Sequence, residues 1–442
     1  MHDNDNEADD GAVARGVNDQ ERHQNQENNA STPQGPGRGD QITGRIAIGI
    51  YGTAFFSLSM VPMSSILVPL WMVSLGATPL MIGLAIGVRS LLPLLLSIHG
   101  GVLMDRLGPR RVTLAVAVMA AALFPLYPLM PWFIAIIFLQ ALFGIAQGLC
   151  WVGSQTFYGQ YMRGHVAGAG RLVLFSNGGC FVGPLVLGAI TEHVGTHAGF
   201  GFMCIWAMLM VGFTLLVPDA QENRQIPNSG SDLSQTTGWR GFLPRLADYR
   251  SALALCVLPV VMMVMIFTFI RIANASVQTS FYVVYLGQIH LGETLIGALL
   301  GIANLVATVT PPLIQAVERR VPALWVLILA TAATIVFMAM TPVLGAVWLL
   351  FCASAAYGAG VGLGFPTLLA LLSRSIPLAE QGKSVGLRTS FNRLASLIIP
   401  IAMGAIAEAF GIRISFFVVG GVLLLATAAT AVWVLRHPGL AR

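Results

Sequence analysis

Long runs of apolar residues, separated by short polar links, form the pattern of this chain from residue 45 onward. A run of about 20 apolar residues is long enough to cross the hydrocarbon core of a bilayer as a helix. Twelve such runs occur, with limits uncertain by a few residues: 45–74, 79–101, 110–129, 132–160, 169–191, 199–217, 252–286, 294–316, 323–342, 345–372, 385–407 and 413–435. The pattern predicts an all-α integral membrane protein with 12 transmembrane helices.

The composition agrees with this prediction. Hydrophobic residues make up 56% of the 442 residues and charged residues only 10%, whereas about a quarter of a soluble domain is charged. The net charge of +5 comes from basic residues that are spread among short links rather than gathered in one patch. We therefore expect membrane lipid around the chain and no nucleic-acid partner.

Two polar segments suggest how the chain is divided. The first 40 residues contain few large apolar side chains and cannot form a packed core, so we expect them to be disordered. They could be a regulatory tail or an inert extension. The expected parts are a tail (1–41), a six-helix bundle (42–217), a central loop (218–250), a second six-helix bundle (251–436) and a short tail (437–442).

The arginine distribution predicts the orientation. Nearly every basic residue of the short links falls on the side of the link at residues 101–111, and only Arg413 falls on the other side. Positive charge accumulates on the cytoplasmic side of a membrane protein. We therefore expect both termini and the central loop in the cytoplasm, in a multi-pass protein of a bacterial inner membrane.

The two halves repeat each other. The stretch from Gly188 to Gly195 recurs from Gly404 to Gly411, at a spacing of 216 residues (404 − 188). The same spacing pairs Pro184 with Pro400. Parallel repeats of this kind predict two pseudo-symmetric bundles that alternate around a central site.

The link between the second and third spans reads Gly-Val-Leu-Met-Asp-Arg-Leu-Gly-Pro-Arg-Arg. It resembles the cytoplasmic signature of the major facilitator superfamily (MFS), and span number, repeat and central loop agree with that family's fold. The resemblance implies a conformational latch, in which Asp105 is the carboxylate and Arg106, Arg110 and Arg111 are its basic partners. The latch residues are thus Gly101, Asp105, Arg106, Gly108, Arg110 and Arg111.

Two further stretches bear on the mechanism. The fifth span resembles the glycine-proline motif of antiporters in this family, through Gly170, Gly179, Gly183, Pro184 and Gly188. Small residues of this kind also occur where helices simply pack closely, so both interpretations stay open. The fourth span keeps a family Gln-Gly pair but has Gly144 where the family has an arginine implicated in proton handling.

The candidate substrate residues are polar groups deep within the spans. No carboxylate lies mid-membrane, but Arg89 and Arg271 do, and a charge there must face water, a partner or a ligand. Neighbouring backbone or amide groups could satisfy them instead. Helical spacing predicts a polar stripe of Arg271, Asn274 and Gln278 on the cavity side of the seventh span. The full candidate set is Arg89, Gln147, Trp151, Gln155, Arg271, Asn274, Gln278 and Phe365.

Four charged side chains lie closer to the ends of their spans. Arg388 is near enough to the interface for its guanidinium to extend into water, whereas Arg393 lies deeper and fits this interpretation less well. Glu192 and Glu408, which are related by the repeat, are expected to cap the outer ends of their own helices rather than to bind ions.

The sequence therefore predicts a secondary active transporter of a small organic solute that works by alternating access. The fifth span favours an antiporter or exporter. The alternatives are a facilitator or exchanger of an organic anion that uses the intramembrane arginines, and a transport-deficient sensor or assembly protein on the same scaffold. Motifs of membrane-embedded enzymes are absent, so we expect no enzyme, cofactor or metal. The partner is a small-molecule substrate, with a coupling proton or a counter-substrate, and we expect a monomer.

Overall fold

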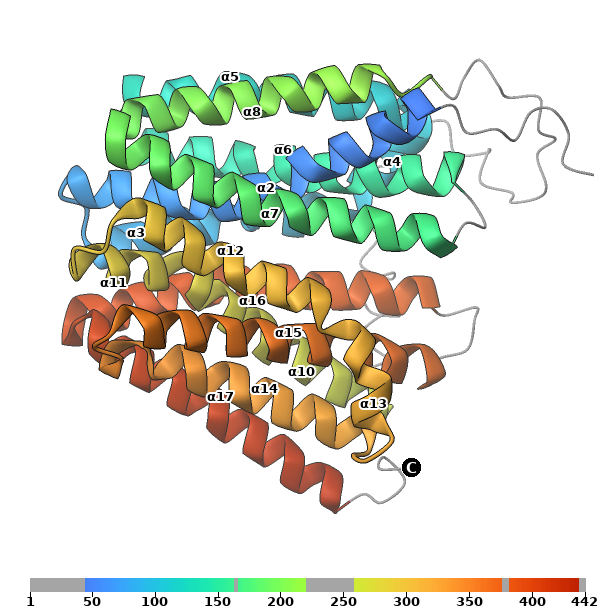
Figure 1. The fold of residues 1–442 in the computed structure, drawn as a ribbon, viewed down its shortest axis with the longest axis vertical. Coiled ribbons are helices and arrows are strands. Elements are labelled where there is room, and N and C mark those ends of the chain that lie inside the picture. The colour runs from blue at the N-terminus through green and yellow to red at the C-terminus, as the bar shows by residue number, and fades with distance from the viewer. Residues whose placement is uncertain (1–43, 163–165, 220–257, 376–380, 437–442) are drawn as a thin grey trace, which may run out of the picture. The chain divides into compact units, whose positions relative to one another are not determined.

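A computed structural model describes residues 44–162, 166–219, 258–375 and 381–436 (Figure 1). Within these ranges the side chains at 97–102, 105–106, 166–167, 169, 373–375 and 381–385 are not described. The predicted tails and most of the predicted central loop therefore lie outside the described residues. So do the side chains of Asp105 and Arg106, and the surroundings of Gly101.

All regular elements of the described residues are helices, and alone or joined end to end they form 12 spans that are long and apolar enough to cross a membrane. This confirms the predicted fold class. The first six spans are formed by α2 (Gly44–Ser74), α3 (Pro79–Val88) with α4 (Leu91–Leu107), α5 (Pro109–Leu129), α6 (Phe133–Tyr161), α7 (Val166–Val194) and α8 (Thr196–Leu215). We call these helices the first half.

The six spans that follow residue 257 are called the second half, and they lie in the lower part of Figure 1. They are formed by α10 (Pro259–Val277), the π-helical turn η4 (Gln278–Tyr282) and α11 (Val283–Gln288); α12 (Glu293–Val309), η5 (Pro311–Leu313) and α13 (Ile314–Glu318); α14 (Ala323–Ala339) and η6 (Thr341–Val343); α15 (Val347–Ser375); α16 (Gln381–Phe410); and α17 (Ile412–Leu435).

Local sequence explains where several helices begin. Pro79, Pro109 and Pro259 each lie at the first helical positions, where a missing N–H costs nothing. Gly195 and Gly411 have φ of 107° and 88°, a backbone conformation that side chains disfavour. These two glycines separate α7 from α8 and α16 from α17, so the repeat in the sequence is also a repeat in backbone geometry.

Two spans are interrupted near the middle. The second span breaks at Arg89 and Ser90, where the N–H of Ser90 donates to the carbonyl oxygen of Gly87 at 2.9 Å, and then continues as α4. The seventh span passes through η4, and single π-helical turns are frequent at functional sites. Both interruptions bring polar groups to the same cavity, which is described below.

An aromatic core fixes α6 within the first half. Tyr127 of α5 stacks on Phe200 of α8, with ring centroids 5.3 Å apart. Phe124 of α5 meets Phe143 of α6 edge to face, also at 5.3 Å. All four side chains are buried, and aromatic pairs of this geometry stabilise a core beyond their area alone. This packing holds α6 in place, and α6 carries one wall of the cavity.

Glycines let the two halves approach each other closely at one end of the molecule. We call this the outer end, meaning the end opposite the link at residues 101–111. A Cβ atom added at Gly83 of α3 would overlap the carbonyl oxygen of Pro400 of α16. One added at Gly404 of α16 would lie 2.7 Å from the carbonyl oxygen of Pro79. Only glycine allows backbones this close.

A second contact of the same kind joins α7 and α12. A Cβ atom at Gly188 would overlap the carbonyl oxygen of Glu293, and one at Gly297 would overlap that of Pro184. Gly188 and Gly404 are related by the sequence repeat, so the outer end is closed by two equivalent contacts. By contrast, Gly170, at the inner end of α7, has no heavy atom within 4 Å of an added Cβ.

Two carboxylates strengthen this closure. The Oε2 atom of Glu192 accepts a hydrogen bond from the backbone N–H of Thr294 at 2.8 Å. The Oε2 atom of Glu408 accepts one from the N–H of Leu80 at 3.0 Å. Each carboxylate thus meets the first turn of a helix in the opposite half, where backbone N–H groups are free and the helix dipole favours negative charge.

The expectation that Glu192 and Glu408 cap their own helices is therefore wrong. The end of α7 or of α16 presents carbonyl oxygens, which repel a carboxylate, whereas the neighbouring α12 and α3 present N–H groups. Each glutamate therefore caps a helix of the opposite half and not the helix to which it belongs.

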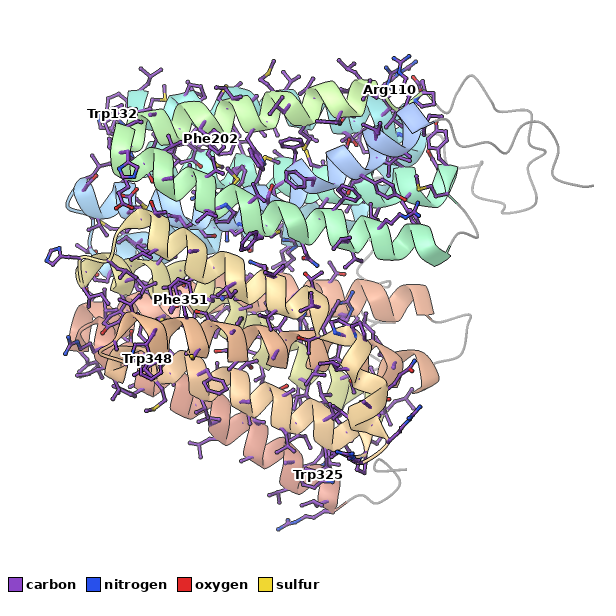
Figure 2. The ribbon with its side chains drawn as sticks, in the orientation of Figure 1. Arg110, Trp132, Phe202, Trp325, Trp348 and Phe351 are labelled. Carbon is purple, nitrogen blue, oxygen red and sulfur yellow. The ribbon has the colours of Figure 1, made fainter. Side chains whose placement is uncertain are left out.

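Replacement of both carboxylates by amides tests this closure. In the double variant Glu192→Gln and Glu408→Gln, the charge that attracts each helix N-terminus is lost, so we expect the outer end to open more often. Distances between spin labels at Trp132→Cys and Trp348→Cys, exposed positions near this end (Figure 2), report the change in a background without the native cysteines. Glu318→Gln, at the inner end of α13, is the control. A distance distribution identical to that of the control would contradict the role of the carboxylates.

Candidate functional site

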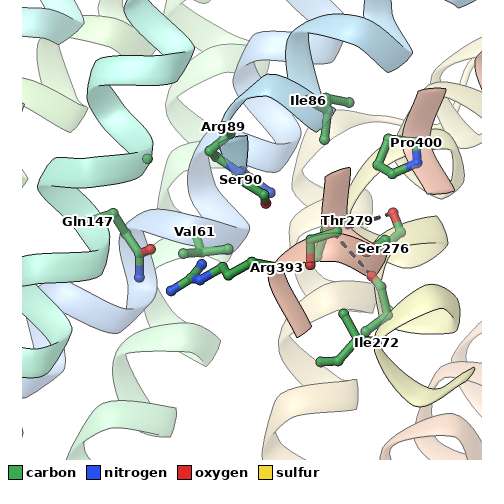
Figure 3. A pocket seen from close by; sticks show the side chains of 13 residues that line it. Val61, Ile86, Arg89, Ser90, Gln147, Ile272, Ser276, Thr279, Arg393 and Pro400 are labelled. Carbon is green, nitrogen blue, oxygen red and sulfur yellow. Dashed lines mark hydrogen bonds between the residues drawn. The ribbon is translucent and has the colours of Figure 1, made fainter. Parts of the chain in front are cut away.

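A cavity of about 140 Å³ lies between the two halves, roughly midway along the spans. This volume is about ten times what one water molecule needs, so a small polar molecule fits. Most polar residues of the lining appear in Figure 3, and they come from both halves: Arg89, Ser90 and Gln147 from the first, and Ser276, Thr279, Arg393 and Ser396 from the second.

Arg89 is placed by the break in the second span. Its Nη1 atom donates hydrogen bonds to the hydroxyl oxygens of Ser64 and Ser65, both at 3.2 Å. These two serines donate their own hydrogens to the carbonyl oxygen of Val61, which leaves their lone pairs free for the guanidinium. The hydroxyls fix the direction of the guanidinium, but they do not neutralise its charge.

Arg393 reaches the cavity from the opposite half. It extends from α16 toward α6, and its Nη2 atom would lie 3.7 Å from a Cβ atom built on Gly148. Figure 3 shows its guanidinium beside Gln147. Arg393 and Arg89 are close enough to repel each other electrostatically. The cavity therefore holds two like charges, one from each half.

No carboxylate of the cavity lining offsets these charges. The lining contains no Asp or Glu, and within the described ranges the one ion pair joins Arg111 to Asp219. A buried charge is costly unless an opposite charge and hydrogen bonds compensate it. The cavity is therefore complementary to an anion, with serine, threonine and glutamine side chains as additional hydrogen-bonding groups.

Gly144 explains why the fourth span lacks an arginine at this position. A Cβ atom at Gly144 would overlap the carbonyl oxygen of Arg89, so the backbone break occupies the space of a side chain. Gly144 and Arg89 line the same cavity. The second span thus supplies a guanidinium at a place where the fourth span has no room for one.

Arg271 lies beside the cavity rather than in its lining. Its guanidinium carbon is 4.7 Å from the ring centroid of Phe365 on α15, a cation–π contact. The residues of α10 and η4 that line the cavity are Ile272, Ala275, Ser276 and Thr279.

The polar stripe that follows Arg271 also points elsewhere. Gln278 lies among Met338 and Tyr357 of α14 and α15, and Asn274 lies beside Phe416 of α17. Each residue of the stripe directly precedes a residue that lines the cavity. Because successive residues of a helix are turned by about 100°, the stripe lies on a different face of the helix from the cavity. The stripe therefore packs within the second half in this conformation, which differs from the predicted direction.

The remaining candidates on α6 are distributed along it. Gln147 is buried at the cavity. Trp151 is half-buried and Gln155 is exposed, and neither belongs to the lining of this cavity.

The described part of the predicted latch contacts its own half. The Nη2 atom of Arg110 donates to the carbonyl oxygen of Leu215 at 3.2 Å, and the Nε atom of Arg111 donates to Oδ2 of Asp219 at 3.1 Å. Gly108 has φ of 86° and forms the turn between α4 and α5. These contacts tie the link to the end of α8, and the role of Asp105 stays a prediction.

The glycine-proline motif contacts two helices. A Cβ atom at Gly179 would overlap the carbonyl oxygen of Phe55 on α2, and one at Gly183 would lie 2.7 Å from the sulfur of Met63 on α2. Pro184 and Gly188 instead face α12 of the other half. The motif is thus a packing surface, and it contributes one side of the α7–α12 contact at the outer end.

Comparison with known proteins identifies the family. A sequence model of the Major Facilitator Superfamily matches residues 48–343 and 264–442. The chain belongs to the major facilitator superfamily. It is a membrane transporter and not an enzyme.

Solved structures share the MFS fold. The nucleoside transporter NupG is 13% identical, with a TM-score of 0.71 over 88% of this chain and 98% of that one. A peptide transporter POT in complex with sulfate is 18% identical, with a TM-score of 0.71 over 94% and 99%. A POT family transporter in complex with 5-aminolevulinic acid is 16% identical, with a TM-score of 0.67 over 93% and 99%. At these identities the likeness shows the fold alone. No curated protein matches the sequence.

The contact between Gly144 and Arg89 gives a testable prediction. Gly144→Ala places a methyl group against a backbone oxygen, and overpacking of this kind costs about 1–3 kcal/mol. We expect a lower melting temperature in detergent. Gly159→Ala in the same helix is the matched control, because an added Cβ there meets nothing within 4 Å. Equal melting temperatures for the two variants would contradict the contact.

Proposed function

We propose that this MFS transporter carries a small organic anion, which binds between Arg89 and Arg393. The observation that carries the proposal is a cavity with a guanidinium from each half and no carboxylate in its lining. A guanidinium binds carboxylate, sulfonate or phosphate through two parallel hydrogen bonds, with charge as well as geometry in its favour. A cation in the same place would meet two positive charges.

The placement of the arginines also supports alternating access. An anion held by Arg89 and Arg393 would be bonded to both halves at once, because these residues come from the second span and from α16. Binding would then replace the repulsion between the guanidiniums by attraction to a shared ligand. In our proposal the outer end closes through the α3–α16 and α7–α12 contacts, and the cavity opens to the cytoplasm.

The absence of acids from the lining bears on the coupling of transport. A proton relay usually needs a carboxylate within the membrane, and the lining has none. This favours facilitated diffusion or exchange of anions over proton-coupled export. The glycine-proline motif of α7 is compatible with exchange, since it forms part of the contact that must break in each cycle.

The test uses Arg89→Gln and Arg393→Gln. A panel of small carboxylates, sulfonates and phosphate esters is screened for thermal stabilisation of the wild-type protein, and uptake of the strongest binder into proteoliposomes is measured. Each glutamine variant loses a charged hydrogen-bonding group, which weakens binding by about 10- to 100-fold. Arg413→Gln, an exposed arginine at the outer end, is the control.

Two results would overturn this proposal. One is that no anion in the panel stabilises the wild-type protein more than it stabilises the two variants. The other is that small organic cations stabilise the wild-type protein better than anions of the same size.

A further inference from the structure

A second pair of arginines shares one aromatic ring. The guanidinium carbon of Arg271 on α10 lies 4.7 Å from the ring centroid of Phe365, and that of Arg388 on α16 lies 6.0 Å from it. The two arginines are close enough to repel each other. Residues from three helices of the second half, α10, α15 and α16, thus place two positive charges next to one phenyl ring.

Neither arginine has a counterion among the residues that the structure describes, where the one ion pair is that of Arg111 with Asp219. The Nε atoms of both Arg271 and Arg388 are buried without a hydrogen-bond partner. The Oδ1 atom of Asn392, one turn further along α16, is also unpartnered. The other titratable neighbour of Arg271 is the phenol of Tyr357, which carries no charge near neutral pH.

A ring cannot replace an anion here. A cation–π contact is weaker than the penalty for removing a guanidinium from water, and one ring serves both cations. Donors that remain unpaired when buried cost further stability. The cluster is therefore complementary to an oxyanion such as a carboxylate, sulfonate or phosphate group, as is the pair formed by Arg89 and Arg393.

The repeat of the two halves provides a comparison for the two arginines of α16. At the spacing of 216 residues, Arg388 corresponds to Leu172 (388 − 216) and Arg393 to Asn177 (393 − 216) of α7. The equivalent helix of the first half therefore packs without either charge. Both charges are thus particular to α16, and each of them lies near an arginine of another span.

The two pairs are neighbours along α16. Arg388 precedes Arg393 by five residues, which corresponds to about 7.5 Å along the helix axis. Arg271 directly precedes Ile272, which lines the cavity. The second pair thus lies to the inner side of the first, and the same five residues turn Arg388 by about 140° around α16 from Arg393. A ligand that contacts both pairs must therefore be extended.

We propose that Arg271 and Arg388 form a second anion subsite and that the substrate is a small dianion with an acidic group at each end. One acid binds between Arg89 and Arg393, and the other binds between Arg271 and Arg388 beside Phe365. Dicarboxylates and carboxylates with a phosphate ester belong to this class. The inference rests on the proposed function and adds the second charge to it.

The experiment compares monoanions with dianions of matched length. Linear alkanesulfonates and α,ω-alkanedisulfonates of two to six carbons are fully ionised, and their affinities are obtained from thermal stabilisation of the full-length protein. We expect the best disulfonate to bind at least tenfold more tightly than the monosulfonate of the same length. Arg388→Gln should reduce this ratio to about 1, and Arg388→Lys should retain part of it. Arg319→Gln, an exposed arginine at the inner end, should retain the full ratio.

The outcomes separate this inference from the proposed function. If sulfonates bind in a manner that depends on Arg89 and Arg393 but disulfonates have no advantage at any length, the second subsite is excluded and the proposed function stands. If Arg388→Gln weakens monosulfonates and disulfonates by the same factor, the arginine does not hold a second acid. If no sulfonate, carboxylate or phosphate ester binds, both proposals fail.

Discussion

The cavity between the two halves is governed by one constraint: it buries guanidinium charge, and its lining has no carboxylate to compensate that charge. Arg89 and Arg393 face one cavity from opposite halves, and no acidic residue lines it. Serine hydroxyls orient Arg89 but cannot neutralise it. A membrane protein retains such charges only where water, a partner or a ligand compensates them. A bound anion would supply the compensation that the chain itself does not.

In the proposed transport cycle, the outer closure is the contact that opens and reforms. Glycines allow α3 to touch α16 and α7 to touch α12, and a glutamate from α16 or α7 caps the N-terminus of its partner helix. Buried apolar side chains of the same four helices pack beside these contacts, among them Ile82, Leu187, Ile296 and Met403. The two glutamates themselves are exposed, and exposed charged contacts contribute little to stability in water. The exposed carboxylate caps are therefore the part of the closure that would break most easily in the proposed cycle.

The sequence predicted what depends on local composition. Hydropathy indicated the 12 spans, and depth within a span singled out Arg89 and Arg271. The contact of Gly144 with Arg89 and the reach of Arg393 toward Gly148 could not be predicted, because they join helices that are distant in the chain. The direction of Asn274 and the partner of Glu192 depended likewise on the rotation and placement of neighbouring helices.

The most direct test of the account is to locate a bound anion. A crystal structure of the wild-type protein with 2-bromoethanesulfonate would show the bromine by its anomalous scattering. The account predicts a bromine peak in the cavity, with sulfonate oxygens about 2.7–2.9 Å from the guanidinium nitrogens of Arg89 and Arg393. A cavity without the sulfonate, at a concentration that stabilises the protein, would contradict it.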